Sequence, residues 1–129
     1  MFTDSRFEKF TGSPAGPRKN PQPHITIGRS GLIYLNAAAY KELGRPGYVT
    51  LYYSGEDDAI AVEPTFPPTP ESFPVTKKQH GWAIHTSAFC RRFRIRVSGT
   101  QVFLRPEFKP GILILNLRET DSISIRDPA

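Results

Sequence analysis

The sequence has a single cysteine, a single methionine and a single tryptophan among its 129 residues, and it contains no long apolar run. One cysteine excludes an internal disulfide, which agrees with a reducing compartment. A membrane-spanning helix needs about 18 or more consecutive apolar residues, so none is expected. Residues 1–20 also lack the apolar stretch of a secretory signal. We therefore expect a soluble, cytoplasmic protein with no membrane contact.

The chain length and the many helix-breaking residues limit the fold class. A chain of 129 residues corresponds to one domain of common size. The 13 prolines and 10 glycines exclude long uninterrupted helices and therefore an all-α bundle. Nine phenylalanines and five tyrosines supply bulky side chains for a core.

Positive charge is concentrated in one stretch of the chain. There are 17 Lys and Arg against 12 Asp and Glu, a formal net charge of +5. Residues 77–105 contain seven basic and no acidic residues, so this stretch carries +7 and the rest, with ten basic and twelve acidic residues, carries −2. Such a field attracts polyanions. Nucleic acid is the expected partner, and an acidic protein is the alternative. The explanation that requires no partner is that the basic residues only keep the surface soluble.

Two proline-rich stretches divide the chain. Residues 1–23 lack apolar periodicity, which favours a flexible arm, although Phe2, Phe7 and Phe10 lie in it. Residues 64–74 read PTFPPTPESFP, which is typical of a semi-extended linker. The predicted parts are the arm (1–23), a first unit (24–63), the linker (64–74), a second unit (75–118) and a tail (119–129).

The two units resemble each other. Ile25-Thr26 lies fifty positions before Val75-Thr76, Gly31 lies fifty before Gly81, and residues 59–62 match 112–115 at a spacing of 53. Each unit is expected to form a strand, a turn, a second strand, a short helix and a β-hairpin. The predicted hairpins join residues 48–53 to 59–63 and residues 101–105 to 112–115.

Each unit has the signals of one short helix. Asn36 and Thr86 are suited to cap helices over residues 36–43 and 86–92, and Leu43-Gly44 is a stop signal. After the second helix, residues 92–97 read RFRIRV. This alternation predicts an extended segment from Phe93 onward whose arginines emerge on one face.

The first unit, ITIGRSGLIYLNAAAYKELGRPGYVTLYYSGEDDAIAVEP, resembles the AbrB/SpoVT-like swapped-hairpin family. The resemblance covers about forty residues and lies in the order strand, basic turn with glycine, strand, short helix ending in Leu-Gly, and hairpin ending near proline. The matching residues are Gly31, Ile33, Leu35, Asn36, Leu43, Gly44, Gly47, Val49, Leu51, Ile60, Val62 and Pro64. Arg29-Ser30-Gly31-Leu32 and the cap Asn36 depart from the family's usual Lys-Gly-Gln turn and cap proline.

The resemblance implies an all-β, β-rich fold with two short helices. Two family units interleave into one small closed barrel, so a tandem duplication on one chain would form the barrel from residues 24–118. A monomer is then expected, with weak dimerisation as the alternative. The resemblance further implies a DNA-binding, transcription-regulatory module without enzymatic activity.

The expected nucleic-acid-binding residues come from two arguments. The resemblance places Arg29 and Lys77 or Lys78 at the basic turns, and the charge concentration adds the arginines of the second unit. The full set is Arg29, Lys77, Lys78, Arg91, Arg92, Arg94, Arg96 and Arg105. The alternative function is that of a protein-interaction adaptor or inhibitor whose basic face meets an acidic protein.

Other chemically suggestive residues have ordinary explanations. His80, His85 and Cys90 lack the spacing of a metal site, so no metal or other cofactor is expected, and Cys90 is expected to be a small buried residue. The acidic run at residues 56–58 suits a hairpin turn. Tyr34, Tyr52, Tyr53 and Trp82 could stack on bases, but at least half of them should face the core.

Overall fold

The computed structural model describes residues 22–123, which fold into a β-rich structure with two short helices, as expected from the sequence. The predicted N-terminal arm, with Phe2, Phe7 and Phe10, lies almost entirely outside the described residues. In chain order the elements are β1 (Ile25–Ile27), β2 (Leu32–Leu35), α1 (Ala37–Glu42), β3 (Tyr48–Ser54), β4 (Ala59–Pro64), β5 (Phe73–Pro74), β6 (Thr76–Lys78), β7 (Gly81–His85), α2 (Ser87–Arg92), β8 (Gln101–Phe103), β9 (Glu107–Lys109), β10 (Ile112–Asn116) and β11 (Thr120–Ser122).

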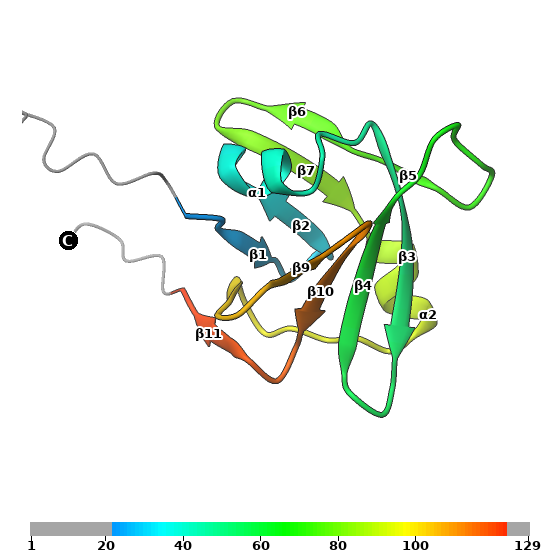
Figure 1. The fold of residues 1–129 in the computed structure, drawn as a ribbon. Coiled ribbons are helices and arrows are strands. Elements are labelled where there is room, and N and C mark those ends of the chain that lie inside the picture. The colour runs from blue at the N-terminus through cyan, green and yellow to red at the C-terminus, as the bar shows by residue number, and fades with distance from the viewer. Residues whose placement is uncertain (1–21, 124–129) are drawn as a thin grey trace, which may run out of the picture.

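The strands form two sheets rather than one closed barrel (Figure 1). We call the six-stranded sheet, in the order β11-β8-β1-β2-β7-β6, sheet A, and the five-stranded sheet, β5-β3-β4-β10-β9, sheet B. Closure would require the edge strands of the two sheets to pair along their length, and these strands are only two or three residues long. The expected closed barrel is therefore not confirmed.

Equivalent strands of the two sequence units pair with each other in both sheets. In sheet A, β2 and β7 are antiparallel about the central pair Tyr34 and Ala83, with Ile33 opposite Ile84 and Leu35 opposite Trp82. Such reciprocal pairing is what two related units around an approximate twofold axis would give.

Sheet B repeats this arrangement with β4 and β10. The central pair is Ala61 and Ile114, flanked by Val62 opposite Leu113 and by Ile60 opposite Leu115. In sheet B the central residues Ala61 and Ile114 lie on the outer face, because their neighbours along each strand are buried and successive side chains point to opposite faces.

Alternating apolar residues from both sheets form one core. Ile33 and Leu35 on β2 are fully buried, and so are Ile60 and Val62 on β4. Full burial of such a side chain contributes roughly 1.5–3 kcal/mol. Neither unit could bury its apolar face alone, so the core holds the two units together.

The second predicted hairpin is wrong. Strand β8 does not pair with β10. It pairs with β1 and β11 in sheet A, whereas β10 is flanked by β9 and β4 in sheet B. The chain therefore crosses from sheet A to sheet B between Phe103 and Glu107, and the turn that closes onto β10 is formed at Pro110-Gly111. Strand β11 also extends the sheet past residue 118, where the sequence predicted a tail.

The two helices follow the sequence prediction within one residue at each end. The side chain of Asn36 caps α1 by accepting a hydrogen bond from the Ala39 amide (2.9 Å). Thr86 precedes α2 but makes no side-chain cap, because its hydroxyl donates to the Gly31 carbonyl instead. This contact and the bond from the Thr86 amide to the same carbonyl dock the β1–β2 turn on the start of α2.

The predicted extended segment from Phe93 is wrong in its first half. Arg92 is the last helical residue, Phe93 is the helix C-cap, and Arg94 has a left-handed backbone with φ of 55°. Residues 95–97 have no regular secondary structure. The alternation nevertheless persists, because Ile95 and Val97 pack against the core and leave Arg94 and Arg96 exposed.

Gly31 is required where the β1–β2 turn meets α2. Its φ is +81°, and an added Cβ would lie 2.9 Å from the Cα and the amide nitrogen of Ser87. Gly81, by contrast, begins β7 and is not in the turn before it. The two glycines therefore do not occupy equivalent positions, which corrects their match in the sequence.

We predict that Gly31→Ala lowers the free energy of unfolding by about 2–4 kcal/mol, because a left-handed alanine is strained and its Cβ collides with α2. Gly111→Ala is the matched control, since Gly111 has φ of +75° and nothing within 4 Å of an added Cβ. It should cost only about 1 kcal/mol. Urea unfolding measures both, and equal losses would contradict the close contact at Gly31.

Candidate nucleic-acid interface

Four of the eight predicted arginine and lysine residues line one surface cavity of about 250 Å³. They come from separate segments: Arg29 from the β1–β2 turn, Arg91 from α2, and Arg94 and Arg96 from the segment after it. We call these four residues the arginine cluster. The remainder of the lining is Gly28, Ser30, Gly31, Ser87, Cys90, Ile95 and Val97.

The end of α2 determines where the arginines lie. The Arg94 amide donates to the Arg91 carbonyl (3.3 Å), and the Ile95 amide donates to the Cys90 carbonyl (2.8 Å). This is the hydrogen-bond pattern of a Schellman end, whose left-handed residue is usually glycine. Here that residue is Arg94, and the sharp turn directs the following chain past Arg29.

Among residues 22–123, no carboxylate forms an ion pair with the arginine cluster. All four arginines are exposed, and within residues 22–123 the single ion pair is between Lys109 and Glu107 (3.8 Å). Arg92, on α2, lies with its guanidinium 5.1 Å from the centroid of the Phe93 ring. The electrostatic field of the arginine cluster therefore extends into solvent, where a polyanion can meet it.

Two further hollows adjoin the cavity. One, of about 750 Å³, shares Gly28, Arg29 and Ser30 and continues over Thr26 and Tyr34 of sheet A. The other, of about 370 Å³, shares the segment from Arg94 to Val97 and reaches Tyr53 on β3 and Asp58 in the β3–β4 turn. The arginine cluster thus contributes residues to all three hollows.

Asp58 is the carboxylate on the border of this surface. It accepts a 2.6 Å hydrogen bond from the Tyr53 hydroxyl. This bond, together with desolvation and the negative charge of Asp58, raises the pKa of Tyr53 above its usual value of 10.0. The carboxylate of Asp58 is thus held by the hydroxyl of Tyr53.

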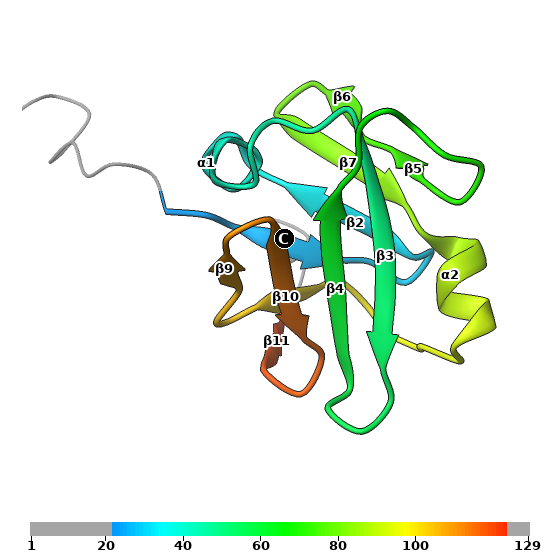
Figure 2. The ribbon, with the colours of Figure 1, turned by 45° about the vertical axis from the view of Figure 1, so that its right-hand side comes forward.

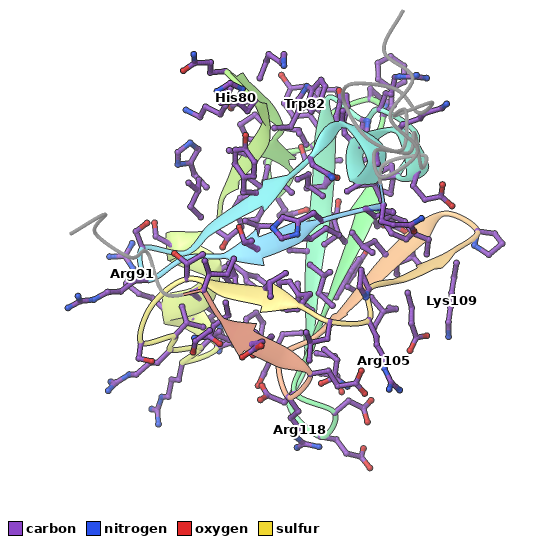
Figure 3. All side chains as sticks on the ribbon, turned by 90° about the vertical axis from the view of Figure 1, so that its left-hand side faces the viewer. His80, Trp82, Arg91, Arg105, Lys109 and Arg118 are labelled. Atoms are coloured by element: carbon purple, nitrogen blue, oxygen red, sulfur yellow. The ribbon has the colours of Figure 1, made fainter. Side chains whose placement is uncertain are left out.

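The other predicted basic residues lie elsewhere. Lys77 and Lys78 are on β6 at the far edge of sheet A, and the Lys77 ammonium lies 4.2 Å from the Trp82 ring centroid. Arg105 follows β8 on the side of the molecule opposite Arg91, near Lys109 (Figure 3). The structure therefore does not bring all eight predicted residues onto one face.

The remaining candidates are placed as follows. Cys90 is buried, as expected, with its sulfur 3.4 Å from the Thr86 hydroxyl, while His80 and His85 are exposed. Between residues 22 and 123 no three metal-binding side chains come together. Trp82 is half-buried and stacks on Tyr40, with the ring centroids 4.0 Å apart. Tyr52 is exposed but donates its hydroxyl to Glu63 (2.8 Å).

Sequence reasoning missed the hydroxyl groups of the cavity. Ser30 and Ser87 line it together with the arginines, and they are 57 positions apart in the chain. They meet because the β1–β2 turn docks on α2 through Gly31 and Thr86. No spacing in the sequence signals this contact.

No protein-family model, curated protein or solved structure matches the chain. Neither helix in the described part is long and apolar enough to cross a membrane.

We predict that Arg94→Gly raises the free energy of unfolding by about 0.5–1 kcal/mol, because glycine adopts the left-handed conformation without strain. Arg94→Ala, which removes the charge but keeps the strained backbone, should leave stability nearly unchanged. Denaturant unfolding of the two variants separates these effects. A destabilised Arg94→Gly would show that the Arg94 side chain holds the fold together.

Proposed function

We propose that the protein is a non-enzymatic DNA-binding module that contacts the phosphates of duplex DNA through the arginine cluster. The observation that carries this proposal is that Arg29, Arg91, Arg94 and Arg96 meet around one cavity without a carboxylate partner among the described residues. Their convergence depends on the fold, since the cluster draws on segments more than sixty residues apart.

The chemistry of the cavity suits phosphate. An arginine guanidinium donates two parallel hydrogen bonds to a phosphate and keeps its proton at any physiological pH. The hydroxyls of Ser30 and Ser87 add donors of the kind that fix the register of a DNA backbone. Such contacts provide affinity and salt dependence, whereas sequence choice would require contacts to the bases.

Arg94 contributes to the cavity from a left-handed backbone position. A left-handed arginine costs about 1 kcal/mol or more relative to glycine, and the corresponding residue after α1 is Gly44, with φ of 94°. Arg45 and Asp58 are left-handed as well, with φ of 53° and 51°, so Arg94 is distinguished by lining the cavity with the other three arginines rather than by its backbone.

The resemblance to the AbrB/SpoVT-like family is part of this proposal. Two units whose equivalent strands pair in both sheets are compatible with a tandem pair of swapped-hairpin units on one chain. On this basis we further propose a monomeric transcription regulator that acts in the cytoplasm.

Duplex affinity should fall steeply with salt. If all four arginines contact phosphates, the slope of log K against log salt concentration should be about −3 to −4. Fluorescence anisotropy of a labelled duplex at several salt concentrations measures this slope. Changing Arg29 and Arg96 together to glutamine should reduce its magnitude by about 2.

The matched control changes Arg105 and Lys109 to glutamine, which removes the same charge on the opposite side of the molecule (Figure 3). This variant should keep the wild-type slope. Absence of wild-type binding at low salt would reject the DNA proposal. An acidic protein would then remain as the partner of the basic surface.

A further inference from the structure

The ends of α1 and α2 are built in the same way. After α1, the amides of Leu43, Gly44 and Arg45 donate to the carbonyls of Ala39, Lys41 and Tyr40. After α2, the amides of Phe93, Arg94 and Ile95 donate to the carbonyls of Phe89, Arg91 and Cys90. Every donor and acceptor is displaced by fifty positions, so the two helix ends have the same hydrogen-bond pattern, although Arg45 is left-handed (φ 53°) and Ile95 is not.

These equivalent positions carry different charges. The positions of Arg91, Arg92, Arg94 and Arg96 after α2 correspond to Lys41, Glu42, Gly44 and Pro46 after α1. The first set carries +4. The second set carries one positive and one negative charge, which gives zero, and Arg45, in the position of Ile95, brings residues 41–46 to +1. The turn that docks beside α2 supplies Arg29, whereas the β6–β7 turn consists of Gln79 and His80 and follows Lys77 and Lys78 at the end of β6.

The surface near α1 is also differently occupied. A hollow of about 490 Å³ lies there, lined by Pro23, Ala37, Ala38, Tyr40, Lys41, Glu42, Arg45 and Trp82. Its lining contains the carboxylate of Glu42 as well as the cations Lys41 and Arg45. The indole of Trp82 is packed between Tyr40 and the Lys77 ammonium, so that neither of its faces is free to stack on a base.

We call the end of α2 with the β1–β2 turn the α2 lobe, and the end of α1 with the β6–β7 turn the α1 lobe. From this contrast we infer that the protein binds duplex DNA through only one of these two equivalent lobes, the α2 lobe. This inference rests on the proposed function. It adds that one chain has one binding site and that its contact surface lacks the twofold symmetry of the two sheets. The helices α1 and α2 lie on opposite sides of the molecule (Figure 2).

A paired set of variants tests the inference. The α2 variant combines Arg91→Gln with Arg94→Gly, a glycine already present in the equivalent position after α1. The α1 variant combines Lys41→Gln with Arg45→Gln and removes the same number of positive charges. Near 0.1 M salt, each lost phosphate contact weakens binding about tenfold. The α2 variant should therefore lose roughly 100-fold in affinity, and the α1 variant should lose less than about twofold.

The stoichiometry provides a second readout. Titration of a short duplex, at concentrations well above the dissociation constant, should saturate at one duplex per chain. Two duplexes per chain, or equal losses in the two variants, would overturn the one-lobe inference and leave the DNA proposal standing. Failure of the wild-type protein to bind duplex at low salt would overturn both. Unfolding curves of the two variants show whether each is folded.

Discussion

The pairing of β2 with β7 and of β4 with β10 is the constraint on which the rest of the structure depends. Each of these contacts joins the first half of the described chain to the second, and the fully buried side chains of Ile33, Leu35, Ile60 and Val62 lie on the inner faces of the paired strands. Because the two sheets share one core, separating the halves would expose the apolar faces of both. The positions of the arginine cluster depend on this pairing, because the β1–β2 turn can dock on α2 only when the two halves are interleaved.

The approximate symmetry of the sheets and the asymmetry of the surface have separate physical origins. Inward-facing positions must fill one common core, so both halves present branched aliphatic or aromatic residues there. Outward-facing positions and helix ends carry no such requirement. Arg94 and Gly44 show the difference, because they have the same hydrogen bonds and the same left-handed backbone but opposite consequences for stability and charge. The fold thus has two lobes with the same backbone hydrogen bonds, and only the α2 lobe carries the arginine cluster.

Much of the local structure was predictable. The helix positions followed from the Asn36 and Leu43-Gly44 signals, and the long hairpin of β3 and β4 followed from its polar turn, because such signals act over a few residues. The extended segment after Phe93 was predicted wrongly since alternation of apolar and basic residues fits both a strand and an irregular chain. The Schellman end of α2 fixes the irregular conformation, because the amides of Arg94 and Ile95 donate to the carbonyls of Arg91 and Cys90 rather than to a neighbouring strand.

The sequence by itself determined a β-rich class, two short helices and an uneven distribution of positive charge, because composition, periodicity and capping act within a few neighbouring residues. Only the tertiary structure decided that β8 joins β1 rather than β10, and that Arg29 lies beside Arg94 and Arg96 while Lys77, Lys78 and Arg105 lie elsewhere. Strand pairing between distant segments depends on the packing of a shared core. Several pairings are compatible with the local sequence, and the choice among them is made only when the whole chain has folded.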